Sequence, residues 1–187
     1  DLGAAIEAAK TKPFGHEAFY PGPGVGGHCI PIDPNYLSWL VRSVGYRFRF
    51  VELAEEISDR MPAYVAKRVQ DTLNTLRKSV NGSVILLLGV TYKANVSDER
   101  ETPARPLAAL LGEMGADVRF FDPFVDVFRV NGEELIGETN LREAVGTADL
   151  VVLLQAHDEI LQSDVFPNAG YVLDTRGVLT GANVERL

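Results

Sequence analysis

The sequence of 187 residues has little cysteine, no cluster of positive charge and no long apolar run. Its single cysteine, Cys29, excludes a disulfide within the chain and fits a reducing compartment. A net charge of −8 without a basic cluster argues against nucleic acid and membranes as partners. The longest apolar run, VILLLGV from Val84, is too short to span a bilayer, and no signal-peptide pattern is present. We therefore expect a cytoplasmic protein, which can still bind an anionic small molecule where a few cations converge.

The sequence also lacks an initiator methionine. Its opening, DLGAAIEAAK, has the pattern of a helix already under way, with Leu2, Ile6 and Ala9 on one face. We therefore expect a piece of a longer protein. The hydrophobic content of 46% is that of a globular chain, and the pattern divides it into segments 1–79 and 80–187.

The first segment is predicted to be helical. A helix is expected in DPNYLSWLVRSVG, with Asp33 as N-cap, Pro34 at the first helical position and Gly45 as terminator. A longer helix is expected from about Phe50 to Lys78, with Pro62 bending or restarting it. Its apolar stripe fits packing against a second copy or against the chain's own core, and periodicity does not separate the two.

The second segment alternates strands with helices. Strands are expected in NGSVILLLG, ADVRFFDP, DLVVLLQAHDEI and GYVLDTRG, and helices in TPARPLAALLGEMG, with Thr102 as N-cap, and LREAVGTA. This order predicts an α/β, Rossmann-like domain with a parallel sheet covered on both faces. Ligands of such sheets bind at the carboxyl ends of the strands, here GVTYKANVSDER, DPFV, QAHD and DTRG.

Residues 21–34 read PGPGVGGHCIPIDP and contain a match to the dinucleotide-binding pattern G-x-G-x-x-G at Gly22, Gly24 and Gly27. That pattern requires a strand before it and a helix starting within it. The preceding KTKPFGHEAFYP is no strand, and Pro31 and Pro34 are expected to break a helix after His28. The glycines therefore predict a loop around Cys29 rather than a dinucleotide site.

Cys29 has two interpretations from its surroundings alone. Glycines beside it allow close approach of a substrate, and an accessible thiolate forms covalent intermediates. Free cysteines are also common as buried structural residues. His28 could be a base or a loop hydrogen-bond partner, and Asp33 could orient a water, cap its helix or do both.

Three stretches carry a family resemblance: YPGPGVGGHCIPIDPNYLSW, ELAEEISDRMPAYV and GVTYKANVSDERETPA. They resemble the UDP-glucose/GDP-mannose dehydrogenase family of nucleotide-sugar 6-dehydrogenases. The wording KTKPFGHEAFYPGPGVGGHCIPIDP is most similar to the branch that oxidises UDP-N-acetylglucosamine, with UDP-N-acetylmannosamine next. The resemblance covers nearly the whole chain.

The resemblance implies an architecture and a mechanism. The family has an N-terminal NAD-binding domain, a central helical domain whose long helix forms a homodimer, and a C-terminal UDP-binding domain. This chain would hold the end of the central domain and the whole C-terminal one, with the NAD fingerprint and a catalytic lysine and asparagine upstream. NAD would accept two hydrides from C6 of the sugar, through a thiohemiacetal and a thioester on Cys29.

Site residues follow from the same resemblance. Cys29 and Asp33 match the nucleophile and the residue that assists water, while Ile32 replaces a lysine of the glucose-specific branch. Arg100 matches a contact to NAD. Residues matching the sugar-nucleotide site are Phe19, Tyr20, Gly26, Tyr92, Lys93 and Arg176, and Lys12 matches loosely a cation donated across the dimer.

Some alternatives stay open. Lys93, Arg100 and Arg176 could be solvated surface charges, although strand ends favour a role in diphosphate binding. His157 is expected to be structural, and no metal site is predicted. The parent could oxidise UDP-N-acetylmannosamine or UDP-glucose instead. The isolated chain could be a UDP-sugar-binding and dimerisation module without activity.

Overall fold

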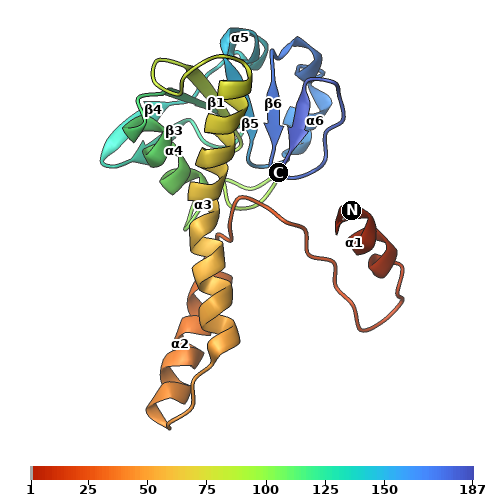
Figure 1. Cartoon of the computed structure of the whole chain (residues 1–187), viewed down its shortest axis with the longest axis vertical. Coiled ribbons are helices and arrows are strands. Elements are labelled where there is room, and N and C mark those ends of the chain that lie inside the picture. Colours follow the sequence, from red (N-terminus) through yellow and green to blue (C-terminus); the bar gives the residue numbers. More distant parts are fainter. Residues whose placement is uncertain (1) are drawn as a thin grey trace.

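The computed structural model describes residues 2–187, which form three parts (Figure 1). A sheet domain occupies one end, and an arm of two helices, α2 (Cys29–Ser43) and the lower half of α3 (Arg49–Thr75), projects from it. Helix α1 (Leu2–Lys10) lies to one side and is joined to the arm by an irregular segment. In the described part of the chain, no helix is both long and apolar enough to cross a membrane.

The sheet is parallel and five-stranded, as the sequence predicts for an α/β domain. Its strands run in the order β2 (Asp117–Phe121), β1 (Val84–Leu88), β5 (Leu150–Leu153), β6 (Val172–Asp174) and β7 (Val184–Arg186). Strands β1, β2, β5 and β6 lie within the stretches expected for them. Strand β7 was not expected, because its three residues mix polar with apolar side chains at partly exposed positions.

Helices cover both faces because successive side chains of a strand point to opposite sides. Ile85 and Leu87 join one core with residues of α3 and of α4 (Ala104–Glu113). Leu86 and Leu88 join a second core with α5 (Leu141–Thr147) and α6 (Asp158–Gln162). A short 3₁₀ helix, η1 (Phe166–Asn168), completes that second face.

A β-hairpin follows β2 and was missed. It pairs β3 (Val127–Val130) with β4 (Glu133–Ile136), and the turn between them is Asn131–Gly132, a dipeptide typical of tight hairpins. Arg105 of α4 ties the hairpin to the main sheet domain, since its guanidinium donates to the Arg129 carbonyl (3.0 Å) and to the Glu99 carboxylate (3.2 Å). The Asn–Gly pair was the signal that could have identified the hairpin.

Helix α2 corrects one prediction. It begins at Cys29 and runs through Pro31 and Pro34, so Asp33 lies inside it and is not its N-cap. Pro31 falls in the first turn, where backbone N–H groups have no helical partner, and only Pro34 removes a hydrogen bond. Gly45 does follow the end of the helix, where its N–H donates to the Arg42 carbonyl. The prolines therefore do not stop a helix after His28.

Helix α3 is continuous through Pro62, which does not restart it. Its apolar stripe divides into two halves. Val65, Val69 and Leu73 are fully buried in the core of the sheet domain, whereas Phe50 and Ile57 are 86% and 55% exposed. Core packing thus accounts for the upper half of the stripe, and the lower half is an exposed apolar surface.

Candidate functional site

The glycine segment before Cys29 lies directly on the loop that follows β1. The Gly27 N–H donates to the Arg100 carbonyl at 3.0 Å. A Cβ on Gly26 would stand 2.6 Å from the Tyr92 Cβ and 2.7 Å from the Glu101 carbonyl oxygen, so only glycine fits there. The glycines therefore let backbone pack against backbone, and the two stretches that carried the family resemblance are in contact.

Cys29 is exposed and is the first residue of α2. Asp33, also exposed, follows one turn later on the same face of the helix, where residues four apart are neighbours. His28 has a helical backbone conformation (φ −93°, ψ −46°) and directly precedes the helix. The helix thus places the Asp33 carboxylate on the side of the thiol, an arrangement that a loop would not ensure.

Arg100 lies near Cys29, and its charge is already paired. Its guanidinium donates to Asp98 at 2.6 and 3.0 Å. The Arg100 guanidinium holds the pKa of the Asp98 carboxyl below its usual value, and Asp98 in turn raises the pKa of Arg100. The cation is therefore held next to the cysteine in a fixed orientation, although both side chains remain reachable from solvent.

Arg176 is the most unusual charge in the structure. It follows β6 and is largely buried, and among the described residues no hydrogen bond or ion pair reaches its guanidinium. Burial lowers the pKa of Arg176, because removing a charge from water is costly, and the nearby Asp174 carboxylate opposes this shift only in part. A Cβ on Gly22 would stand 2.7 Å from its Nη1. An anion is the partner that this guanidinium lacks.

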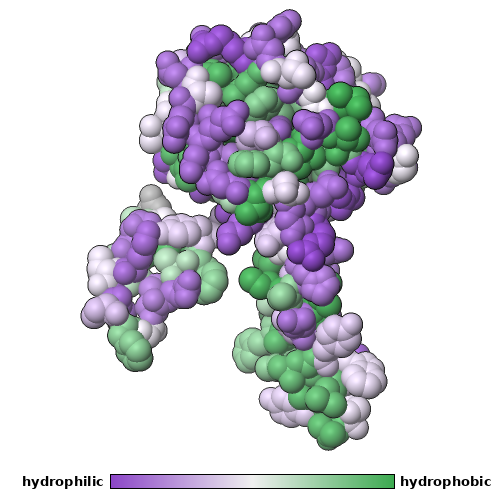
Figure 2. All heavy atoms as spheres, turned by 180° about the vertical axis from the view of Figure 1, so that it is seen from behind, coloured by the Kyte–Doolittle hydropathy of each residue, from purple (hydrophilic) through white to green (hydrophobic). Residues whose placement is uncertain are grey.

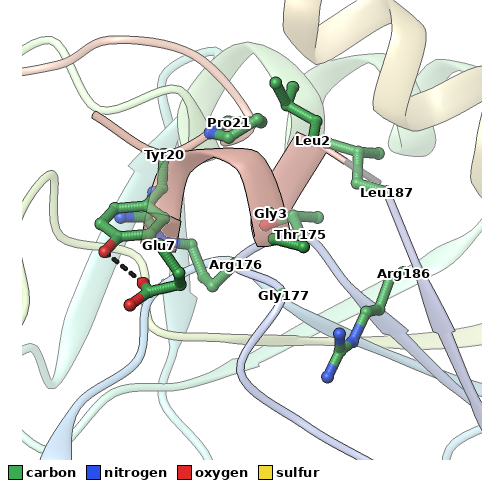
Figure 3. Close-up of a pocket in the computed structure, with 11 residues that line it drawn as sticks. Leu2, Gly3, Glu7, Tyr20, Pro21, Thr175, Arg176, Gly177, Arg186 and Leu187 are labelled. Atoms are coloured by element: carbon green, nitrogen blue, oxygen red, sulfur yellow. Dashed lines mark hydrogen bonds between the residues drawn. The ribbon is translucent and has the colours of Figure 1, made fainter. Parts of the chain in front are cut away.

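The pocket beside Arg176 is large enough for a small ligand, at about 560 Å³ (Figure 3). Tyr20 lines it together with Arg176, and the Tyr20 hydroxyl donates to Glu7 of α1 at 2.6 Å. The Arg176 turn is held by Asp174, whose carboxylate accepts the N–H groups of Arg176 (2.8 Å) and Gly177 (3.0 Å). Glu7 was not foreseen from the sequence.

The residues expected at the site thus form two groups. Cys29, Gly26, Tyr92 and Arg100 gather where the glycine segment meets the loop after β1, and Tyr20 gathers with Arg176 in the pocket. The residues that line the pocket do not include Cys29, so this pocket and the expected nucleophile are separate places in this structure. Phe19, Lys93 and Lys12 are exposed and line neither group.

Comparison with known proteins decides the family. Residues 86–181 match the UDP binding domain of the UDP-glucose/GDP-mannose dehydrogenase family, and residues 1–60 match its central domain. The chain belongs to the UDP-glucose/GDP-mannose dehydrogenase family. The cysteine segment thus lies in the central-domain match, and Arg176 and the loop after β1 lie in the UDP-binding match.

Individual members of the family agree. The chain is 41% identical, over 74% of its length, to a UDP-N-acetyl-D-mannosamine dehydrogenase of Methanococcus maripaludis, and covers 30% of that protein. It is 34% identical, over 85% of its length, to a UDP-N-acetyl-D-glucosamine 6-dehydrogenase of Pseudomonas aeruginosa, and covers 37% of it. The chain therefore spans less than half the length of these dehydrogenases.

A solved structure shows the same fold. A UDP-D-ManNAc dehydrogenase of Pyrococcus horikoshii superposes with a TM-score of 0.81 and 27% identity, over 99% of this chain and 43% of that one. The arrangement of arm, cysteine segment and sheet domain is therefore a property of this dehydrogenase family.

Proposed function

We propose that this chain is part of an NAD-dependent nucleotide-sugar 6-dehydrogenase that oxidises the C6 alcohol of a UDP-hexose to the uronic acid. The observation that carries the proposal is the contact between the two matched regions. The Gly22–Gly27 segment, which leads into Cys29, lies against Tyr92 on one side and against the unpaired guanidinium of Arg176 on the other. A nucleotide sugar held by the sheet domain would thus have its sugar beside the cysteine.

The proposed chemistry proceeds in balanced steps. NAD, held by the upstream domain of the parent protein, accepts hydride in each oxidation. After the first, the Cys29 sulfur adds to C6 of the aldehyde and the carbonyl oxygen takes up a proton. After the second, C6 is a thioester, and water cleaves its C–S bond to give the acid and the free thiol. Two hydrides leave and one water is consumed for each sugar.

The chain's own residues have separate tasks in this scheme. Cys29 keeps the aldehyde bound, and Asp33, one turn along α2, accepts a proton from the attacking water. Arg176 pairs with the diphosphate, with Tyr92 and Lys93 beside the nucleotide sugar and Phe19 and Tyr20 near the sugar. Arg100, held by Asp98, faces the bound cofactor. We also propose that the part of the central domain ends at residue 79 and that the UDP-binding domain begins at residue 80.

The substrate is proposed to be a UDP-N-acetylhexosamine. The sequence favours UDP-N-acetylglucosamine, and one of the relatives bears that name. Relatives named for UDP-N-acetylmannosamine include one with higher identity to this chain, so UDP-N-acetylmannosamine is an equally supported substrate. UDP-glucose is the weaker alternative, because Ile32 stands where the glucose-specific branch has a lysine.

A homodimer is proposed to form through the arm. Large apolar side chains are exposed over α2 and the lower half of α3 (Figure 2), including Tyr36, Trp39, Val44, Phe50, Leu53 and Ile57. Patches of this kind mark interaction surfaces in soluble proteins. A second copy is the proposed occupant, as the family resemblance implies. The isolated chain is then a UDP-sugar-binding, dimerising module without activity of its own, because hydride transfer needs the upstream domain.

The test is an assay of the full-length enzyme with NAD and a panel of UDP-sugars. We expect turnover with a UDP-N-acetylhexosamine and two NADH formed per sugar. The Cys29→Ser variant should still bind the sugar but lose at least about 100-fold in turnover, because a hydroxyl is a poorer nucleophile than a partly ionised thiol. Uronic acid made by Cys29→Ser at the wild-type rate would exclude covalent catalysis by this residue.

A further inference from the structure

A buried polar cluster lies behind the loop that follows β1. His157, which follows β5, is fully buried, and its ring is tilted by 46° to the ring of Phe124, with the two centroids 5.2 Å apart. Its Nε2 atom is 3.1 Å from the Thr91 hydroxyl and 3.1 Å from the Asp122 carboxylate. Its Nδ1 atom lies 2.9 Å from the backbone nitrogen of Asn95. Both ring nitrogens thus have protein partners.

These partners assign the position of the proton on the ring. The Asn95 N–H is a donor, so Nδ1 accepts and carries no hydrogen. The Thr91 hydroxyl donates to the Lys93 carbonyl at 2.9 Å, so it accepts from Nε2, as does the carboxylate of Asp122. His157 is therefore the neutral ring with its hydrogen on Nε2. A proton added at Nδ1 would face another donor.

The same contacts fix the loop that carries the proposed site residues. The Thr91 hydroxyl connects His157 to the Lys93 carbonyl through two hydrogen bonds in series. Asn95 has a left-handed backbone (φ +62°), which costs energy and persists only where the surroundings hold it. Its N–H is held by His157, and its side-chain oxygen accepts the N–H of Asp158 at 2.9 Å. Residues 157 and 158 thus form hydrogen bonds with the backbone and the side chain of Asn95, in the middle of the loop.

We propose that His157 is a positioning residue for the loop 91–101, and that it acts as a fixed Nε2–H tautomer whose Nδ1 atom accepts the Asn95 N–H. It touches no substrate. It sets where Tyr92, Lys93 and Arg100 stand when the nucleotide sugar and cofactor bind, and in that respect the inference rests on the proposed function. An apolar residue of similar size would fill the space but leave the Asn95 N–H and the Asp122 carboxylate without this partner.

Two substitutions test the contacts of the two ring nitrogens separately. The side-chain oxygen of Asn stands near the Nδ1 position, so His157→Asn keeps the acceptor for Asn95. The side-chain nitrogen of Gln stands near the Nε2 position, so His157→Gln keeps the bond to Asp122 and loses the acceptor. Hydrogen exchange of the amides of residues 93–97 is the measurement. We expect His157→Gln to exchange at least about tenfold faster at Asn95, and His157→Asn to stay close to wild type.

The wild-type chain gives a second measurement that needs no variant. Nitrogen-15 spectra of the imidazole distinguish the two neutral tautomers, and we expect hydrogen on Nε2 alone. Hydrogen on Nδ1, or equal Asn95 exchange in His157→Gln and His157→Asn, would overturn the proposal. If His157→Gln does not fold, the tautomer and the exchange of His157→Asn decide.

Titration with UDP separates this inference from the proposed function. We expect the affinity of His157→Gln for UDP to fall about tenfold, while His157→Asn stays within about threefold of wild type. A wild-type chain that binds no UDP would refute the proposed function. The exchange and tautomer results would still decide whether His157 holds the Asn95 N–H. Equal UDP affinity in wild type and in a His157→Gln chain whose loop exchanges fast would refute the positioning role.

Discussion

Two glycines determine how closely the cysteine segment approaches the sheet domain. Gly22 leaves room for the guanidinium of Arg176, and Gly26 leaves room for Tyr92 and the carbonyl of Glu101. A side chain at position 26 would push the segment away from the loop after β1, whereas one at position 22 would displace the end of the Arg176 side chain. The short contacts therefore determine whether Cys29 lies near the residues proposed to hold the substrate.

Gly26→Ala tests this close approach. The added methyl group would meet backbone and Cβ atoms that cannot turn aside, and we expect a loss of about 1–3 kcal/mol in the free energy of unfolding, measured with urea. Gly112→Ala in α4 is the matched control, because nothing lies within 4 Å of a Cβ there. It should stabilise the helix by up to about 1 kcal/mol. Similar stabilities for the two variants would contradict the contact.

The sequence singled out candidate site residues but not their arrangement. Cys29, Tyr92, Arg100 and Arg176 were identified because they sit in recognisable stretches or at strand ends. The grouping of Tyr20 with Arg176, away from Cys29, depends on contacts between distant segments, which no local pattern encodes. His157 was foreseen only as structural, since its ring partners come from two distant parts of the chain, the loop after β1 and Asp122 after β2.

At the scale of elements, apolar runs bounded by glycine located four of the five strands of the main sheet. The start of α2 was placed five residues late, at Pro34 rather than Cys29, because prolines were taken as helix breakers although Pro31 lies in the first turn, where its missing N–H has no helical partner to lose. The hairpin and β7 were missed because their strands mix polar with apolar residues at partly exposed positions, whereas β5 and β6 are as short but mostly apolar and buried. Buried apolar strands are thus the ones that the sequence specifies locally.

An ion pair joins three of these elements and makes stability depend on pH. The Asp149 carboxylate before β5 pairs with Lys78 after α3 and accepts the N–H of Val84 in β1 at 2.8 Å. Lys78 and that N–H lower the pKa of Asp149 below its model-peptide value of 3.8. A depressed folded-state pKa stabilises the fold above that value, and the contribution is lost as pH falls through the folded-state pKa.

Asp149→Asn should therefore cost about 1 kcal/mol of unfolding free energy at neutral pH and make stability less dependent on pH below about 4. Asp71→Asn is the control, because Asp71 pairs with Lys67 on the exposed face of α3, where ion pairs contribute little. Urea unfolding at a series of pH values measures both. The same pH profile in wild type and in Asp149→Asn would show that the pair does not link folding to protonation.

The arm carries the exposed apolar surface through which we propose that the homodimer forms. We expect the wild-type chain to sediment as a dimer at high micromolar concentration, and Phe50→Ser combined with Ile57→Ser to sediment as a monomer. Phe14→Ser is the control, since Phe14 is 91% exposed and lies outside the arm. A wild-type chain that is monomeric under these conditions would contradict dimerisation through this surface in the isolated chain.

At the scale of the whole molecule, α3 connects the two proposed functions. Its upper half is part of the sheet-domain core, and its lower half carries the exposed apolar surface of the arm. Arg68 in the upper half pairs with Glu185 of β7, which ties the helix to the far edge of the sheet. The arm and the sheet domain therefore share one continuous helix.

The central claim is that the carboxyl edge of the sheet binds the UDP moiety beside the cysteine segment. Calorimetric titration of this chain with UDP tests it most directly, without NAD or turnover. We expect the wild type and the control Lys67→Glu, on the exposed face of α3, to bind equally. Arg176→Ala should lose at least about tenfold in affinity, and Lys93→Glu should abolish binding. Unchanged affinity in both site variants, or no binding by the wild type, would contradict the account.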